Sequence, residues 1–567
     1  MSALVLSRRD VLLGTAATAL VVAQTGQGWS APAVVRPDIA SPAGRRMVGF
    51  YAAAVKAMQD PAINYPPQPQ SWTFQAYMHA VPLNPFDPAN SGGLKGTDLK
   101  KRIDVIYGNP AAGTPQAAWK AAAQACWATC RHSSPYFTTW HRWYLHYFES
   151  ICRKMSGHPE FALPYWNYAS NNGASLQLPD QFRQVSPDPA NPNVLFFDDR
   201  GLGFANAQAD GAQNVAMNDG GFMPFSQSQY GPALAAKQMF PSDDADHIAF
   251  DTTDPVYLAL GMTGRLECVP HDMVHVNIGG WMQNVPSAAG DPIFYMHHCQ
   301  IDRLYASWEA QPGSTYNFGT TASQPDENSF KNTAMGSFVD ENGVLHTEKL
   351  GGAIDTSALN YSYDKLVPQT VPQLAVALAA RAAPASPLRV AAMEAQKFEV
   401  QSGGSTVTLA PAAPAPVGAA PPPAPPAGAA PAGVGPAAVA APANASQTLV
   451  LKGIKLLRRP RAPLSVFINL PKDTPPRLNN PYYVGTLNFF NFDLSTGGAM
   501  DHDDDPAHAG HPAAAAEARF DVTEVLQRQR AKGQWDGEAI TVTVTTIGAD
   551  APGAITYVTI ESVSLVP

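Results

Sequence analysis

Six histidines fall into two groups, and their spacing restricts how this chain can fold. The first group is His79, His132 and His141, and the second is His271, His275 and His298. Imidazoles that bind one metal ion have to converge in space, and three of them form a common ligand set for a transition metal. Two sets of three therefore predict two adjacent metal ions.

The second group is typical of two packed helices. His271 and His275 are four residues apart, so at about 100° per residue both imidazoles leave the same helix face. Asp291 and Pro292 form a good helix start, with the carboxylate as N-cap and proline in the first turn, which places His298 on a second helix. Packing the two helices brings the third imidazole to the pair.

The first group needs a loop as well as helices. His132 and His141 are nine residues apart, roughly 180° around a continuous helix, and Pro135 lies between them. The two cannot share one helix face. We therefore expect His132 in a loop and His141 in the helix that begins near Trp140, while a short helix ends at His79.

The sequence around these histidines resembles the type-3 copper family of tyrosinases, catechol oxidases and oxygen-carrying hemocyanins. The resemblance is carried by three segments: Cys130 to Tyr144, Glu267 to His275, and Asp291 to Arg303. It implies two copper ions as cofactor, O2 as co-substrate and phenolic small molecules as substrates. It also completes the first group with His79 and, of the neighbours His297 and His298, assigns metal binding to His298.

Zinc is the alternative metal, because three histidines also make catalytic zinc sites and imidazole suits several metals. A zinc-protease helix needs glutamate after its first histidine, whereas Asp272 stands there. Two complete groups and the Cys130-x-His132 pair favour copper. Any one histidine alone would equally fit a hydrogen-bonded core residue.

The chain has five cysteines, an odd number for a protein expected outside the cytoplasm. By resemblance to fungal-type family members, the sulfur of Cys130 bonds to the imidazole of His132, which would hold that loop ligand in place. The other four are expected as buried thiols: Cys126, Cys152, Cys268 and Cys299.

The resemblance also implies residues that act on the substrate. Glu267 matches a glutamate that orders a water over the site, and Asp272 stands where its usual asparagine partner would be. Asp272 could take a proton itself, directly or through the water, or the two carboxylates could repel and raise one pKa. Val285 matches a gate over the second copper, where a small side chain would admit a phenol ring.

Charged residues beside the ligands resemble the family's supporting contacts. Arg142 and Asp302, with Glu149 and Arg303, match positions at which carboxylates receive the far imidazole N–H and fix its tautomer. Ordinary ion pairs on helix faces are the alternative.

The chain of 567 residues exceeds what one core usually organises. We predict a mainly α catalytic domain, a helical bundle that holds a dinuclear copper site, and a C-terminal all-β, sandwich-like domain inferred from short alternating runs. The expected boundaries are 1–33 for a signal region, 40–315 for the catalytic domain, 316–370 for a connecting segment like that of plant polyphenol oxidases, 371–447 for an Ala/Pro-rich linker, and 448–567 for the β domain.

The N-terminus predicts export. Arg8 and Arg9 precede an apolar run to about Ala23, which is too short to span a bilayer as a mature helix. The pair indicates the twin-arginine export machinery as a partner and a periplasmic or secreted protein without stable membrane insertion. A chance arginine pair before another secretory signal is the alternative. The formal charge of −9 argues against nucleic acid as a partner.

The C-terminal domain resembles the one that covers the active site of plant polyphenol oxidases until it is removed, which predicts a latent enzyme. Candidate covering residues are Phe489, Phe490 and Phe492, although aromatics in a strand equally fit a core. The segment Met500–His511 is rich in Asp and His and could handle copper or simply be a soluble loop.

These observations predict a tyrosinase-like polyphenol oxidase that hydroxylates monophenols to o-diphenols and oxidises these to o-quinones. The alternatives are a catechol or o-aminophenol oxidase without hydroxylation, a hemocyanin-like oxygen carrier, and a secreted protein that only binds copper.

Overall fold

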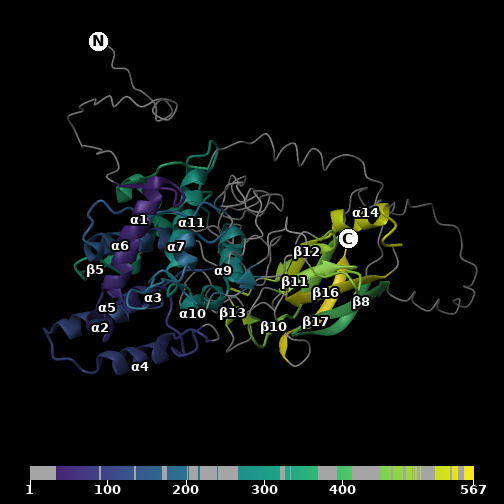
Figure 1. Ribbon diagram of the computed structural model, residues 1–567, viewed down its shortest axis with the longest axis horizontal. Coiled ribbons are helices and arrows are strands. Elements are labelled where there is room, and N and C mark those ends of the chain that lie inside the picture. The colour runs from purple at the N-terminus through teal and green to yellow at the C-terminus, as the bar shows by residue number, and fades with distance from the viewer. Residues whose placement is uncertain are drawn as a thin grey trace, which may run out of the picture.

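A helical part and a sheet-rich part lie next to each other in the computed structural model of this chain (Figure 1). The helices between Pro42 and Glu309 form the helical part, and the strands from Met393 onward form the sheet-rich part. The structure describes residues 34–200 with breaks at 89–90, 133–135, 169–174, 176 and 199; 202–203, 215–216 and 239; 266–367 with breaks at 320–325 and 333; 393–411; and 447–566 with breaks at 461–463, 477–479, 488, 491, 494–497, 500–516, 537–538 and 547–554.

Helix α11 (Ile293–Glu309) lies at the centre of the helical part. Every residue from Ile293 to Trp308 is buried, and a helix buried on all sides belongs inside a core. Helix α6 (Phe137–Ser156) contacts α11 and is itself covered by α1 (Pro42–Met58). Two of the candidate histidine segments therefore belong to the most buried helices of the molecule.

Local capping explains where two of the histidine-bearing helices begin. The hydroxyl of Ser71 accepts the N–H of Phe74 in the first turn of α3 (Trp72–His79). The carboxylate of Asp291 accepts the N–H of Ile293 at 3.1 Å. Side-chain acceptors of this kind satisfy N–H groups that have no partner inside the helix. The helix predicted here is present, but it begins at Ile293 with Pro292 rather than Asp291 at the N-cap position.

Shorter elements surround this core. The remaining helices are α2 (Pro61–Asn64), α4 (Gly96–Tyr107), α5 (Pro115–Cys126), α7 (Asp180–Arg183), η5 (Glu267–Asp272), α9 (Met273–Ile278), η6 (Gly280–Gln283), α10 (Val285–Ala288), α12 (Glu327–Asn332), η7 (Leu350–Ala353) and η8 (Thr356–Leu359). Small pairs of strands are β1 (Val34–Arg36) with β6 (Tyr361–Tyr363), β2 (Leu202–Gly203) with β3 (Val215–Ala216), β4 (Ala334–Val339) with β5 (Leu345–Lys349), and β13 (Phe492–Asp493) with β14 (Gly498–Ala499).

The segment of the second histidine group is not the regular α-helix that its spacing predicts. It begins as a π-helical stretch, η5, and continues as the α-helix α9. Pro270 lies inside η5. Proline removes one hydrogen-bond donor and its ring crowds the preceding turn, so the helix widens there.

The C-terminal part is one antiparallel sheet of nine strands that has its own core. Along the sheet the order is β12 (Tyr483–Leu487), β11 (Leu464–Ile468), β16 (Ile540–Thr546), β8 (Ser405–Pro411), β7 (Met393–Gln401), β17 (Thr556–Val566), β9 (Thr448–Lys452) and β15 (Glu517–Asp521), with β10 (Lys455–Leu456) beside β17. A Cβ on Gly485 of β12 would lie 2.5 Å from the ring of Phe520 in β15. The two end strands therefore approach each other, and the curled sheet encloses apolar side chains together with α14 (Thr523–Ala531).

The expected linker 371–447 is too long, because residues inside it form two strands of this sheet. Strand β7 pairs with β17, and β8 pairs with β16. Val400 and Leu409 of these strands are fully buried in the C-terminal core. The Ala- and Pro-rich composition around these strands concealed their alternating pattern.

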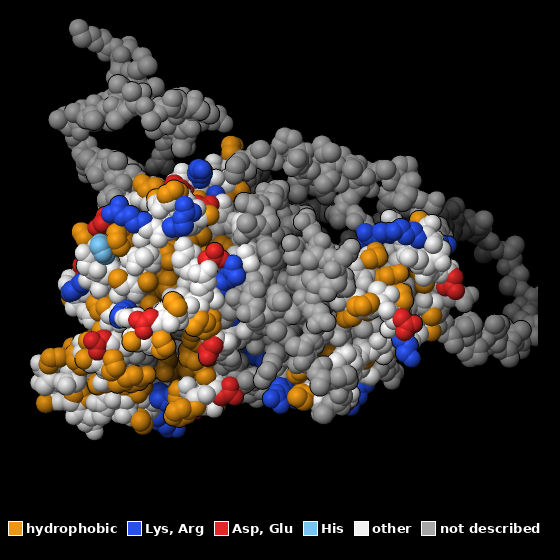
Figure 2. Space-filling view, viewed as in Figure 1, with side chains coloured by type: hydrophobic (Ala, Val, Ile, Leu, Met, Phe, Trp, Pro, Cys, Tyr) orange, Lys and Arg blue, Asp and Glu red, His pale blue; other side chains and the backbone are white. Residues whose placement is uncertain are grey.

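Several sequence predictions lie outside the described residues. These are the signal region 1–33, the Met500–His511 segment, and the side chains of Cys268 and Phe492. On the face shown in Figure 2, charges of both signs are interspersed with apolar side chains over the helical part. Within the described ranges, none of the helices has the length and apolar character needed to span a bilayer.

Candidate metal centre

Three separate segments assemble the first histidine group. His79 is the last residue of α3, His132 lies before α6, and His141 lies in the second turn of α6. Their ligand atoms and the sulfur of Cys130 all lie within 4.8 Å of one another. The loop position of His132 and the helical position of His141 agree with the prediction.

The second group contains one histidine more than predicted. His271, His275, His297 and His298 are buried, and their ligand nitrogens all lie within 4.8 Å of one another. Nδ1 of His297 is 2.9 Å from the hydroxyl of Tyr168, whereas Nε2 of His298 is 3.2 Å from Nε2 of His275. Both neighbours therefore lie within ligand reach of the second group, and the assignment of the third ligand to His298 stays a prediction.

Hydrogen bonds fix the ring orientation of four candidate ligands. Nδ1 lies 3.0 Å from Val285 O in His79, 2.8 Å from Phe137 O in His141, 2.8 Å from Asp272 Oδ1 in His271, and 2.8 Å from Met282 O in His275. Carbonyl and carboxylate oxygens only accept, so each Nδ1 carries the proton and each Nε2 keeps its lone pair. In the described part of the chain, Nε2 of His79 and His271 is buried without a hydrogen-bond partner. A metal ion bound to these nitrogens would satisfy them, so the residues fit a metal.

Burial keeps these imidazoles neutral. It lowers the pKa of His79 to about 3. It also lowers the pKa of His141, His271, His275 and His298 well below the ordinary value, and neighbouring imidazoles lower it further. Neutral imidazole is the form that binds a metal ion.

The two groups share one buried region. The rings of His141 and His298 stack with centroids 4.5 Å apart and planes 17° apart. The centroids of His132 and His271 are 5.6 Å apart. Two metal ions bound to these groups would therefore be neighbours.

Comparison with known proteins decides which family uses this arrangement. The family model described as the common central domain of tyrosinase matches residues 69–311, a range that contains all six histidines. Residues 69–311 therefore match the central domain of the tyrosinase family.

Relatives in this family match only part of their own length. A tyrosinase of a Hahella species is 30% identical over 330 residues, which are 57% of this chain and 61% of that protein. The chloroplastic polyphenol oxidase of Spinacia oleracea is 29% identical over 257 residues, 41% of this chain and 37% of that protein. Among solved structures, latent apple tyrosinase is 20% identical with a TM-score of 0.43, covering 95% of this chain and 98% of that one. This chain thus spans less than two thirds of the first two relatives.

Cys130 lies inside the first group of this tyrosinase-family site. Its sulfur is 3.3 Å from Nε2 of His141, and 3.5 Å and 3.9 Å from Nδ1 and Nε2 of His132. The sulfur therefore faces the ring edge that a thioether would join, and the bond itself stays a prediction. Three other cysteines, Cys126, Cys152 and Cys299, are buried free thiols as expected.

Asp272 has a role that was not among the predicted ones. It is the carboxylate that receives the imidazole N–H of His271, and such a contact fixes the tautomer of a metal ligand and raises its basicity. Glu267 is fully buried one helical turn before His271. Both carboxylates of the family pattern therefore belong to η5.

Val285 lies beside the first group, and its role as a gate over the second metal stays a prediction. Its main-chain oxygen accepts the N–H of His79, and the residue lines a pocket with His79 and His132. Asn284, the residue before Val285, is the N-cap of α10, and α10 contacts α3.

Arg142 and Asp302 do not support the histidines in the way predicted. Nε of Arg142 donates to Oδ1 of Asp302 at 2.6 Å, and Nη1 of Arg36 donates to Oδ2 at 3.1 Å. Tyr361 and Tyr363 donate to the same carboxylate. Although burial acts to raise it, the two arginines hold the pKa of Asp302 below its usual range. The buried pair joins α6 to α11 next to the histidines, because Asp302 lies one helical turn after His298 and Arg142 directly follows His141, so it positions the ligand helices.

Phe490 of the C-terminal part covers the second group. Its ring stacks on His275 with centroids 4.0 Å apart, and lies 5.4 Å from the ring of His271. Arg459 supports this contact, because its Nη1 donates to Gln283 O at 2.9 Å and to Phe489 O at 2.7 Å. Of the covering residues predicted, Phe490 reaches the site and Phe489 packs in the C-terminal core. No pattern in the sequence singled out Arg459.

Proposed function

We propose that this chain is a copper-dependent phenol oxidase of the tyrosinase type, which hydroxylates monophenols and oxidises o-diphenols to o-quinones, and which is latent while Phe490 covers its site. One copper ion would be held by His79, His132 and His141, and the other by His271, His275 and His298. The arrangement of the imidazoles carries the proposal, since Nδ1 is hydrogen-bonded in four of the six and the ligand atoms of each group lie within 4.8 Å of one another.

When bound, the copper pair would supply the activation of O2 and the transfer of electrons from the phenol. The chain would bind and orient the ring. Phe490 lies flat on His275, which supports the same place for the aromatic ring of a substrate once Phe490 has left. The surrounding histidines are at most 2% exposed, so bulk water would be excluded from the reacting atoms.

Proton transfer would distinguish the two reactions. Hydroxylation of a monophenol needs phenolate formation, which a positioned base assists, whereas oxidation of an o-diphenol depends on it less. Glu267 and Asp272 are the carboxylates proposed for this task, and Val285 is proposed to leave space beside the first copper. These three residues would determine whether a monophenol is a substrate.

One observation favours a second candidate, a catechol or o-aminophenol oxidase without hydroxylation. The Oδ1 atom of Asp272 already accepts the N–H of His271. A carboxylate held in this way is a poorer proton acceptor, because accepting a hydrogen bond stabilises its charged form. Glu267 would then carry the proton transfer by itself.

The test is O2 uptake by the copper-loaded full chain, given tyrosine in one experiment and its o-diphenol in another. The wild type is compared with Phe490→Ala, which removes the covering ring. We expect turnover of both substrates to rise at least about tenfold in the variant, a change of about 1.4 kcal/mol in the barrier. Turnover of the o-diphenol alone would establish the second candidate, and no turnover of either would reject both.

A matched variant separates the role of Val285. Val285→Phe fills the space beside the first group and leaves the main-chain acceptor of His79 in place. We expect monophenol turnover to fall more than diphenol turnover.

Export by the twin-arginine route to the periplasm or the outside is proposed from Arg8 and Arg9. Replacing both arginines with lysine should leave the protein in the cytoplasm.

A further inference from the structure

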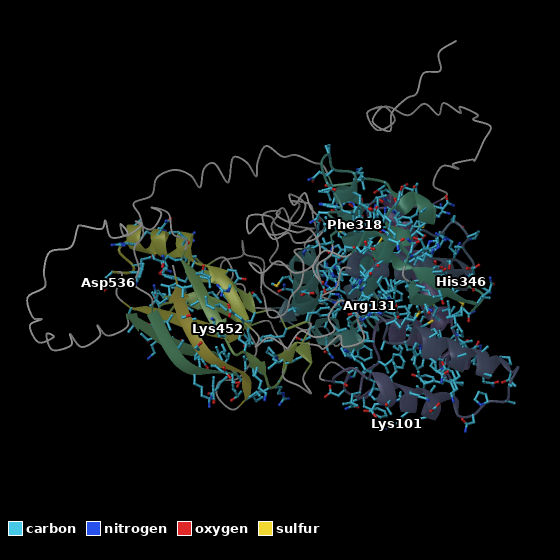
Figure 3. The ribbon with its side chains drawn as sticks, turned by 180° about the vertical axis from the view of Figure 1, so that it is seen from behind. Lys101, Arg131, Phe318, His346, Lys452 and Asp536 are labelled. Carbon is cyan, nitrogen blue, oxygen red and sulfur yellow. The ribbon has the colours of Figure 1, made fainter. Side chains whose placement is uncertain are left out.

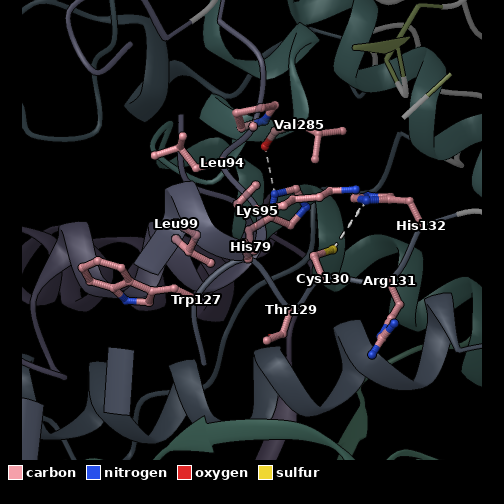
Figure 4. A pocket seen from close by; sticks show the side chains of 15 residues that line it. His79, Leu94, Lys95, Leu99, Trp127, Thr129, Cys130, Arg131, His132 and Val285 are labelled. Atoms are coloured by element: carbon pink, nitrogen blue, oxygen red, sulfur yellow. Dashed lines mark hydrogen bonds between the residues drawn. The ribbon is translucent and has the colours of Figure 1, made fainter. Parts of the chain in front are cut away.

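A pocket of about 250 Å³ opens to the first histidine group from the side of α4. We call it the Cys130 pocket. Its walls are His79, Ala80, Gly93, Leu94, Lys95, Gly96, Leu99, Trp127, Ala128, Thr129, Cys130, Arg131, His132, Val285 and Pro286. In Figure 4, Cys130 and His132 lie at one end of the pocket, with Leu99 and Trp127 at the other, while Arg131 turns away.

The pocket reaches one metal group and not the other. His79, Cys130 and His132 are among its walls, whereas its lining includes no histidine of the second group and no described residue of the C-terminal sheet. Nε2 of His79 is buried there without a hydrogen-bond partner. A ligand in the pocket would therefore meet an unsatisfied nitrogen of the first group.

The second group has a different cover. Phe490 stacks on His275, and the four histidines of that group are at most 1% exposed. Arg459 holds the segment before Phe490 against Gln283. The C-terminal part therefore lies over the second group at His271 and His275.

Cys130 is placed to meet an incoming metal first. Of the four potential ligands in the first group it is the one that is not fully buried. Its sulfur is 3.3 Å from Nε2 of His141 and 3.5 Å from Nδ1 of His132, so one ion could contact all three residues. Thiolate is a soft ligand that selects monovalent copper over the harder divalent metals, and binding releases the thiol proton.

We propose that the Cys130 pocket is the port through which monovalent copper reaches the first group, with the Cys130 thiol as its first ligand, while the C-terminal sheet keeps the second group closed. The proposal rests on the proposed function only in taking copper as the metal. It concerns the chain before any thioether forms, since that bond would consume the thiol. The first site would then fill through a pocket that no described residue of the C-terminal sheet lines, although the ring of Phe490 also lies 5.7 Å from that of His132.

The experiment follows copper uptake by the metal-free full chain without O2. A chelator complex of copper(I) is the donor, and copper bound per chain is measured against time. The wild type should take up one equivalent at least about tenfold faster than the second, whereas Phe490→Ala should take up both rapidly. Uptake of both equivalents together by the wild type would overturn the proposal.

Variants of the pocket identify the port. Leu99→Trp narrows it without touching a ligand, and Cys130→Ala removes the thiol; each should slow the first equivalent at least about tenfold. Cys126→Ala is the matched control, because Cys126 is a buried thiol outside the pocket. Wild-type uptake rates in both pocket variants would reject the port. Phenol turnover is not measured here, so failure of the oxidase proposal would leave these results standing.

Discussion

Four of the six candidate ligands depend on the atom that receives the Nδ1 proton. Three of these acceptors are main-chain oxygens, from Phe137, Met282 and Val285, and one is the carboxylate of Asp272. Main-chain oxygens persist through any substitution that preserves the backbone. Asp272 is therefore the acceptor that mutation can remove cleanly.

Replacing Asp272 should weaken the second metal site. Asp272→Ala removes the acceptor of His271, and loss of such a contact typically costs about 10- to 100-fold in metal affinity. Asp272→Asn keeps an oxygen that can accept, so its affinity should stay within about threefold of the wild type. Competition with a copper(I) chelator measures both values. Equal affinities of wild type and Asp272→Ala would show that the contact does not hold His271.

Among the elements, α6 and α11 carry histidines of different groups, and a buried ion pair fixes one helix to the other. Arg142 belongs to α6 and Asp302 to α11, and both side chains are at most 2% exposed. Buried pairs of this kind matter most when one partner is removed, because the other charge is left without compensation. Strand β1 joins the same pair through Arg36, whose guanidinium also donates to Glu149 at 2.8 Å.

Asp302→Ala should therefore lower the free energy of unfolding by about 3 to 5 kcal/mol. Denaturant unfolding of the full chain measures this change. The control is Asp98→Ala, which breaks an exposed pair with Lys101 and should change stability by less than about 0.5 kcal/mol. A similar small loss in Asp302→Ala would mean that packing alone fixes the helices.

Glu309, at the end of α11, adds a pH dependence to this network. Burial raises the pKa of its carboxyl to about 7, although Arg142 acts to lower it. The unfolded chain releases this proton near pH 4.3, so between about pH 4.3 and pH 7 the folded state holds more protons. Stability contributed by this group therefore falls as pH rises through that range.

Glu309→Gln should remove that part of the pH dependence. The amide keeps an acceptor for Tyr316, which donates to Oε1 at 2.8 Å. Denaturant midpoints at about pH 5 and pH 7 give the slope, and Glu327→Gln on the surface is the control. If stability changes with pH equally in Glu309→Gln and in the control variant, Glu309 does not contribute to the pH dependence.

For the whole molecule, the position of a cut decides whether the covering sheet leaves. Strands β7 and β8 come before residues 412–446 in the chain, whereas their partner strands come after those residues. Strand β7 pairs with β17, and β8 pairs with β16. A cut within 412–446 therefore leaves the two fragments joined through the sheet. A cut within 368–392 passes between the helical part and the complete sheet. Figure 3 shows the same two parts from behind, with Lys452 and Asp536 on the sheet and Arg131 and His346 on the helical part.

A specific protease site engineered into each segment tests this difference. Cutting within 368–392 should release a fragment that separates on size exclusion and should raise O2 uptake with an o-diphenol. Cutting within 412–446 should leave one particle of the original size with low uptake. Equal release from both cuts would show that β7 and β8 contribute little to holding the sheet together.

Local patterns predicted much of the candidate site and less of what surrounds it. The spacing of His271 and His275, and Pro135 between His132 and His141, were sufficient because helix geometry acts over a few residues. Long-range partners left no such signal: Arg36 is 266 residues from Asp302, and Arg459 is 176 residues from Gln283. The same holds for β7, whose partner strand lies at the other end of the C-terminal part.

The pairing of β1 with β6 also constrains when the cover can be removed. The pairing is parallel, with Val34 opposite Tyr361 and Arg36 opposite Tyr363, so residues 1–33 and 368–392 lead away from opposite ends of one short strand pair. Under the proposed twin-arginine route, machinery bound to residues 1–33 would lie close to this strand pair and would hinder a protease that approaches 368–392. Cleavage would then have to wait for arrival, and quinones, which react with many proteins, would not form inside the cell that made the enzyme.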